Sequence, residues 1–104
     1  ARSRCARTLD EALRRQVVVT IEYRDGKNRK TSNRAIEPLA FARTNGHWYL
    51  LAWCQMRKDG RWFRLDRIIR ARLTRRSITP RSIHEVFGEP PADAQPVKID
   101  AAGR

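Results

Sequence analysis

The chain has 104 residues, enough for one small domain with a single modest core. Its 23 Lys and Arg residues outnumber its 11 Asp and Glu residues, which gives a formal net charge of +12 at pH 7. Residues 1–76 carry the whole excess, and the remainder is close to neutral. Such a field attracts polyanions, namely nucleic acids, nucleotides or acidic membrane surfaces. Because most of the basic residues are Arg, the genome's composition is an alternative explanation.

The cysteines and apolar residues exclude several classes of protein. Cys5 and Cys54 are too few for a disulfide framework and lack the CxxC spacing of a zinc site. His47 and His84 are isolated, so they form no metal-binding motif. The longest apolar run, residues 48–54, is far too short to cross a bilayer, and no apolar run follows the basic N-terminus as in a signal peptide. We therefore expect a cytoplasmic protein with no metal, no cofactor and no membrane partner.

The first predicted element is a short helix over residues 8–16, preceded by a basic N-terminal extension over residues 1–7. Thr8 is a suitable N-cap, and Glu11 three residues later completes a capping box. Cys5 lies before this helix, where we expect a frayed end of the chain.

Three turn dipeptides divide the next part of the chain into strands. Asp25-Gly26, Asn45-Gly46 and Asp59-Gly60 tolerate the positive φ angles that tight hairpins need. The strands expected around these turns cover residues 17–23, 30–37, 39–43, 47–55 and 61–65, with Pro38 as an interruption. Cys54 lies in an apolar strand pattern and is expected to be buried.

The region from residue 63 to residue 75 is compatible with two structures. Ile69, Ala71 and Leu73 alternate with polar residues, which indicates a half-exposed strand. Leu65, Ile69 and Leu73 are also spaced by four, as on one face of a helix. The regular turns upstream favour the strand.

The last part of the chain predicts little regular structure. Residues 82–87 lie between prolines and indicate one helical turn, and residues 89–104 form a Pro-containing linker or flexible tail. The predicted fold is therefore mainly β, with about five strands and a short N-terminal helix in one domain over residues 8–88. Strands with such short connections close into a small barrel or sandwich.

Several sequence blocks follow one another in a characteristic order. They are Ile21-Glu22-Tyr23, Asp25-Gly26, Arg34 to Pro38, Gly46 to Leu50 with its Trp-Tyr-Leu triplet, and RWFRLDRI at residues 61–68. In this order and spacing they resemble the WYL domain of bacterial transcription regulators. The resemblance implies an Sm-like β-barrel that senses a negatively charged ligand, such as single-stranded DNA or a nucleotide. It also implies a winged helix-turn-helix partner domain, which these 104 residues lack, so we expect only the sensing half here.

Four arginines are the candidate ligands for the anion: Arg34, Arg61, Arg64 and Arg67. Guanidinium groups bind phosphates bidentately and keep their charge. The resemblance places Arg34 and the arginines of the FRLDRI block along the ligand pocket. The alternative is structural, because Arg64 or Arg67 can instead pair with Asp66 or Glu37 and hold the barrel together.

The aromatic residues of the Trp-Tyr-Leu strand point to opposite faces. By alternation, Trp48 shares a face with Cys54, and Tyr49 shares the other face with Trp53. We expect Tyr49 to form a hydrogen bond with the ligand and Trp48 to be structural. Trp48 and Trp62 are also candidate stacking platforms for a base.

The sequence predicts no catalytic residues, because it contains no nucleophile motif, no carboxylate pair and no glycine-rich phosphate loop. The leading hypothesis is a sensing module for single-stranded nucleic acid or a nucleotide. One alternative is a homodimerisation or protein-interaction module anchored by Trp53 or Trp62. The other is a basic barrel that binds duplex DNA without specificity and with a steep salt dependence.

Overall fold

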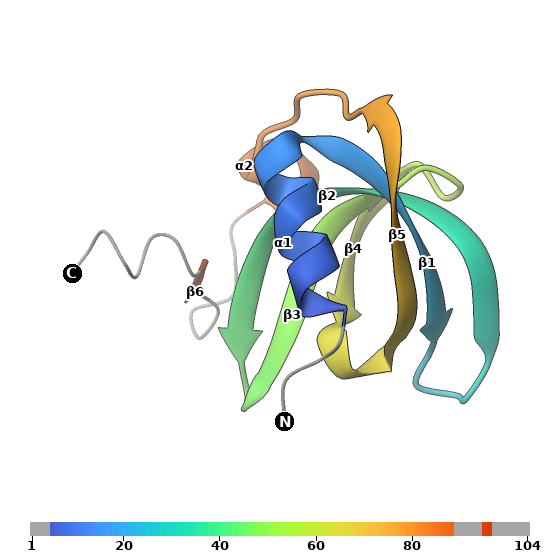
Figure 1. Ribbon diagram of the computed structural model, residues 1–104. Helices are drawn as coiled ribbons and strands as arrows, with labels where there is room; N and C mark the ends of the chain where they lie inside the picture. The colour runs from blue at the N-terminus through green and yellow to red at the C-terminus, as the bar shows by residue number, and fades with distance from the viewer. Residues whose placement is uncertain (1–4, 89–94, 97–104) are drawn as a thin grey trace.

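The structure, a computed structural model, describes residues 5–88 and 95–96 and contains one strongly curved antiparallel sheet (Figure 1). The elements in chain order are α1 (Ala6–Arg15), β1 (Val17–Arg24), β2 (Lys30–Thr44), β3 (His47–Cys54), β4 (Asp59–Arg64), the 3₁₀ helix η1 (Leu65–Arg67), β5 (Ile68–Ser77), α2 (Ile83–Phe87) and β6 (Gln95–Pro96). The main strands lie in the order β4-β3-β2-β1-β5, and β6 pairs with β2. The predicted mainly-β fold with an N-terminal helix is confirmed. The sheet is open rather than a closed barrel, since β4 and β5 form its two edges.

The core lies on the concave side of the sheet, which we call the inner face. Leu9 and Ala12 of α1 pack there against Ile21, Leu50 and Phe63, and all five are buried. The helix crosses in front of the sheet and contacts β1, β2 and β5 (Figure 1). We call the opposite side of the sheet the outer face.

Helix α1 begins two residues earlier than the sequence predicts. Its N-cap is Cys5 rather than Thr8, and no side-chain cap hydrogen bond is present. Cys5 is 7% exposed and belongs to the core cluster, so the expectation of a frayed end there was wrong. Burial of apolar side chains therefore decides the start of this helix more than capping does.

The strands differ from the prediction at two places. β2 continues through Pro38 as one strand, and its pairing with β3 shifts in register between Pro38 and Ala40. The third turn ends before Asp59-Gly60, because Lys58 takes the positive φ of 57° and β4 begins at Asp59. β5 is a strand, which resolves the ambiguity between strand and helix.

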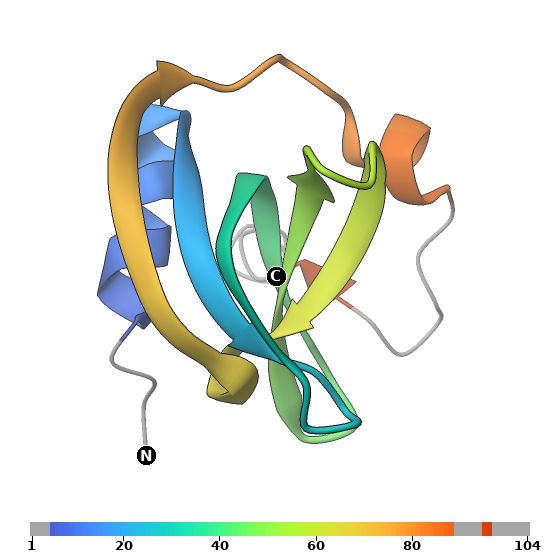
Figure 2. The same ribbon diagram turned by 90° about the vertical axis from the view of Figure 1, so that its right-hand side faces the viewer.

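After β5 the chain crosses the end of the molecule to α2, which packs beside β4 (Figure 2). We call residues 78–88 the C-terminal strap. Its helix α2 confirms the predicted helical turn, and Ser82 and Glu85 form a capping box. The strap begins with a hydrogen bond from the Ile78 amide to the Gln16 carbonyl (3.0 Å). None of the described helices is long and apolar enough to span a membrane. The linker predicted over residues 89–104 lies outside the described residues, apart from β6.

Candidate anion-binding site

Strand β2 carries two buried charged residues, Arg34 and Glu37, on opposite faces of the sheet. Arg34 is paired with Ile21 on β1, so its side chain is on the inner face with the core. Glu37 is paired with Trp53 on β3 and lies on the outer face. The register of β1 and β2 shifts just before Arg34, where Ser32 and Asn33 are both exposed. The extra residue of this bulge changes which side chains of β2 face the core, so that Arg34 points to the inner face.

Arg34 is 7% exposed, yet its Nε and Nη1 atoms are buried and have no hydrogen-bond partner. Its Cζ atom lies 5.7 Å from the centroid of the buried Phe63 ring, and the Cζ of Arg61 lies at the same distance from that centroid. Burial lowers the pKa of the Arg34 guanidinium, and repulsion from Arg61 and Arg57 lowers it further. We call Arg34, Arg57 and Arg61 the inner arginine cluster.

No carboxylate of the described residues forms an ion pair with the inner arginine cluster. A buried cation without a partner is costly, and the usual remedy is an opposite charge that also accepts its hydrogen bonds. A phosphate or carboxylate group would supply an opposite charge and hydrogen-bond acceptors for the Arg34 guanidinium. The cluster is therefore suited to an anionic ligand.

Glu37 on the other face is fully partnered by the strap and by Gln55, the residue that follows β3. Arg81 forms a short ion pair with its Oε1, which also accepts a hydrogen bond from the Thr79 amide (3.0 Å). Its Oε2 accepts from Gln55 Nε2 (2.9 Å). The Arg81 guanidinium lies over the Trp53 ring, 4.0 Å from its centroid. Glu37 is thus the residue that anchors the strap to the sheet.

The structure separates the four predicted anion ligands. Arg34 and Arg61 lie together, whereas Arg64 lies on the outer face and forms a bidentate pair with Asp66 (3.0 and 2.7 Å). That hydrogen bond is the main reason why the pKa of Asp66 is lowered. Arg67 in η1 lies close to Gly26. A Cβ atom added at Gly26 would lie 3.3 Å from Nη1 of Arg67.

The predicted aromatic contacts lie away from the inner arginine cluster. Tyr49 and Trp62 meet edge to face on the outer side, with ring centroids 5.4 Å apart, and Phe87 of the strap covers Trp62 in the same way at 6.3 Å. Trp48 is 39% exposed at the far end of β3, and the Arg43 guanidinium lies 5.4 Å from its ring centroid. Neither Tyr49 nor Trp62 therefore contacts Arg34.

Two further residues of the site were not among the sequence candidates. Phe63 supplies the aromatic ring that two guanidinium groups approach, and Arg57 adds a third cation from the turn between β3 and β4. Strand alternation was a usable signal for Phe63, because Arg61 and Phe63 are two residues apart and share a face. Arg57 lies in a turn, where no such periodicity applies.

Comparison with known proteins gives the family. The family model for the WYL domain matches residues 4–73, more than half of the chain. An uncharacterized HTH-type transcriptional regulator, YobV of Bacillus subtilis (strain 168), is 33% identical over 60 residues, which cover 58% of this chain and 19% of the regulator.

Among solved structures, the proteasome accessory factor B/C (PafBC) of Arthrobacter aurescens has the same fold over 72% of this chain, with a TM-score of 0.67 and 23% sequence identity. The match covers 12% of that protein. The chain therefore spans about a fifth or less of the length of these relatives. With the family model covering both the N-terminal helix and strands β1 to β4, the chain belongs to the WYL domain family.

Proposed function

We propose that this chain is the ligand-sensing domain of a transcription regulator, and that it binds an anionic ligand at the inner arginine cluster without catalysing a reaction. The observation that carries the proposal is the buried Arg34 guanidinium, whose Nε and Nη1 have no partner. A folded domain that tolerates such a cost usually does so for function. Arg61 and Arg57 add charge of the same sign beside it.

The ligand class we propose is a phosphate-bearing molecule, either single-stranded nucleic acid or a nucleotide. Arg34 and Arg61 both approach the Phe63 ring, and the repulsion between them lowers the pKa of Arg34, so two guanidinium groups contribute positive charge to this region. Guanidinium pairs of this kind hold phosphate better than they hold a single carboxylate, because phosphate offers more acceptor oxygens. The name of the Bacillus subtilis relative supports a regulatory role and a helix-turn-helix partner domain in a longer, cytoplasmic protein.

The path from ligand to partner domain would run through strand β2 and the C-terminal strap. Glu37 lies three residues beyond Arg34 and anchors the strap by its pairs with Arg81 and Thr79. Movement of β2 on ligand binding would therefore shift Glu37 and, through its pairs with Arg81 and Thr79, change the position of the strap. The size of any such effect is limited to the difference in ligand affinity between the two states.

Fluorescence anisotropy of a short labelled single-stranded DNA, with inorganic phosphate and a nucleoside triphosphate as competitors, tests this proposal. Arg34→Leu should weaken binding by about tenfold to a hundredfold, because hydrogen bonds to a charged group contribute about 1.5–3 kcal/mol each. The matched control is Arg64→Ala, since Arg64 is already paired with Asp66 on the outer face. If both variants bind all three probes as the wild type does, the inner arginine cluster is not the ligand site.

A further inference from the structure

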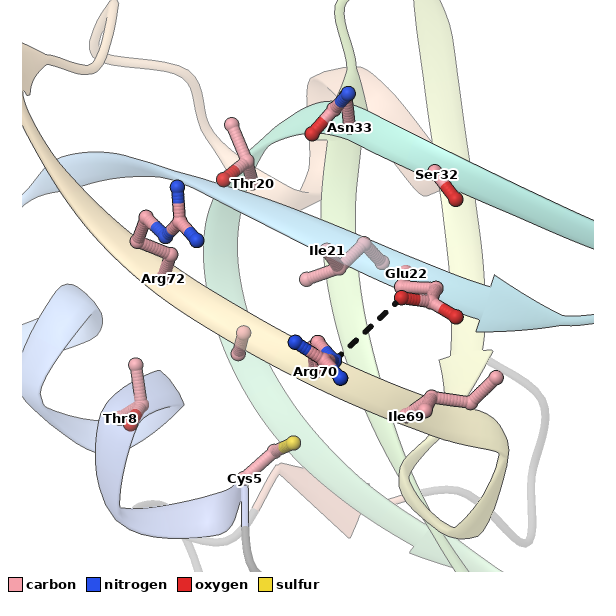
Figure 3. Close-up of a pocket in the computed structure, with 11 residues that line it drawn as sticks. Cys5, Thr8, Thr20, Ile21, Glu22, Ser32, Asn33, Ile69, Arg70 and Arg72 are labelled. Atoms are coloured by element: carbon pink, nitrogen blue, oxygen red, sulfur yellow. Dashed lines mark ion pairs between the residues drawn. The ribbon is translucent and has the colours of Figure 1, made fainter.

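A groove with a volume of about 370 Å³ lies across β1, β2 and β5 beside the start of α1 (Figure 3). Its polar lining comes from Thr8, Thr20, Glu22, Ser32, Asn33, Arg70 and Arg72. Most of these side chains project from the outer face, away from the inner arginine cluster, as the close-up shows for Arg70 and Arg72 on β5. We call it the outer groove.

Two β-bulges shape the outer groove, and both lie next to Glu22. The pairing of β1 with β2 shifts there, so that Ser32 and Asn33 are both exposed, Asn33 with a φ of 55°. The pairing of β1 with β5 shifts at the same place and exposes Ile69 and Arg70 together. Bulges redirect side chains and are common beside binding sites. Here they gather side chains from three strands on one surface.

The charge of the outer groove is positive. Glu22 is its acidic lining residue, and two cations share it: Lys30 at 3.2 Å and Arg70 at 3.7 Å. Arg72 is exposed and has no ion pair within the part of the chain that the structure describes. The end of β5 adds two more exposed arginines. An excess of cations therefore remains after Glu22 has been neutralised.

The neutral polar side chains of the outer groove are also free to bind. Thr8, Thr20, Ser32 and Asn33 form no side-chain hydrogen bond to any described residue. Hydroxyl and amide groups donate hydrogen bonds to phosphate and sugar oxygens in complexes with nucleic acids. The groove therefore combines donors that have no other described partner with guanidinium groups in one depression of the outer face.

We propose that the outer groove binds the sugar–phosphate backbone of duplex DNA without reading its sequence. No aromatic side chain is among its lining residues, so it lacks the stacking platform that proteins use for single strands. A duplex keeps its bases stacked and presents its phosphates outward. Arg70 and Arg72 project from the same side of β5 about 7 Å apart, which is similar to the separation of neighbouring phosphates on one strand.

This inference goes beyond the proposed function, because it concerns a second surface and a different form of nucleic acid. Arg34 faces the core on the inner side, whereas Arg72 is exposed on the outer side. A regulator with such a domain would hold duplex DNA at a second point beside its helix-turn-helix. The two sites can therefore be tested independently.

The test is anisotropy of a short labelled duplex, titrated at about 50 mM and about 200 mM salt. The double variant Arg70→Ala with Arg72→Ala should lose about tenfold in affinity, and its slope of log K against log salt should fall by about 1.8, as for two lost phosphate contacts. The matched control is Arg14→Ala with Arg15→Ala. It removes the same charge from exposed residues already paired with Asp10 and Glu11.

Each outcome decides the proposal. Equal losses in the two double variants would mean that only net charge matters, and absence of duplex binding by the wild type at about 50 mM salt would overturn the groove outright. Arg34→Leu should leave duplex affinity unchanged. Loss of single-strand binding in Arg34→Leu, with duplex binding lost only in the Arg70→Ala and Arg72→Ala double variant, would support both sites. Unchanged single-strand binding in Arg34→Leu would refute the inner site and retain the groove, whereas loss of duplex binding in Arg34→Leu would count against a separate groove. Far-UV circular dichroism confirms that each variant is folded.

Discussion

The two buried charges of β2 differ in what surrounds them, although they are three residues apart. Glu37 on the outer face has Arg81, Thr79 and Gln55 as partners. Arg34 on the inner face is similarly buried and has two nitrogen atoms without any partner. A buried charge with partners holds a fold together, whereas one without partners weakens it. The comparison predicts that loss of the Glu37 charge destabilises the fold, whereas loss of the Arg34 charge does not.

The largest effect should come from Glu37→Ala. The change removes the carboxylate that anchors the strap and leaves Arg81 without its partner, so we expect the free energy of unfolding to fall by about 3 kcal/mol. Urea denaturation followed by tryptophan fluorescence measures it, since Trp53 lies against Arg81. Glu11→Ala is the control, because Glu11 forms surface ion pairs that are worth less than about 1 kcal/mol. Equal losses for both variants would contradict the structural role assigned to Glu37.

The opposite sign is expected for Arg34→Leu. Leucine fills much of the same space without a buried unpaired charge, so the free energy of unfolding should rise by about 1–3 kcal/mol while the affinity for anions falls. Urea denaturation of the ligand-free protein, beside the anisotropy titration, measures both quantities. Arg43→Leu is the control, because Arg43 is exposed beside Trp48. A loss of stability as large as that of Glu37→Ala would make Arg34 a structural residue.

The order and type of the elements could be read from the sequence because they depend on local patterns. Turn dipeptides and alternation predicted the hairpins, and the strand at Ile69 to Leu73 is present. The start of α1 and the continuity of β2 through Pro38 could not be predicted in this way. Both depend on tertiary contacts, namely the burial of Cys5 in the core and a register shift opposite β3.

The candidate site was only partly predictable for the same reason. Arg61 and Arg64 occur in one motif, but an odd separation along a strand places them on opposite faces. The inward direction of Arg34 follows from the bulge at Ser32 and Asn33, which leaves no clear periodic signal. The partner of Glu37 is 44 residues away in the chain, and pairing at such a distance is set by the fold.

Gly60→Ala should displace the strap without removing the charge of Glu37 or of Arg81. It therefore tests whether the strap and the inner arginine cluster act independently. A Cβ at Gly60 would lie 2.9 Å from Phe87 Cε1 and closer still to Val86. We expect a loss of about 1–3 kcal/mol and a red-shifted emission from Trp62, which Phe87 covers. Gly26→Ala is the control, because its nearest neighbour is the flexible end of Arg67, which can move. An unchanged anion affinity in Gly60→Ala would show that the strap is not coupled to the inner arginine cluster.

The smallest effect concerns Asp66, the partner of Arg64 on the outer face. The hydrogen bond from Arg64 lowers the pKa of Asp66 in the folded protein below the ordinary value of 3.8. The stability that this carboxylate contributes is therefore fully present above that value and is lost as the pH falls through the lowered pKa. Because the Asp66 side chain is 59% exposed, the contribution should be less than about 1 kcal/mol.

Urea denaturation of wild type and Asp66→Asn should show a small difference in the free energy of unfolding near pH 6, and this difference should disappear in strong acid. Asp25, whose pKa is also lowered, titrates equally in both proteins and cancels in the comparison. A difference that grew in acid would mean that folding raises the pKa of Asp66, which would contradict its pairing with Arg64.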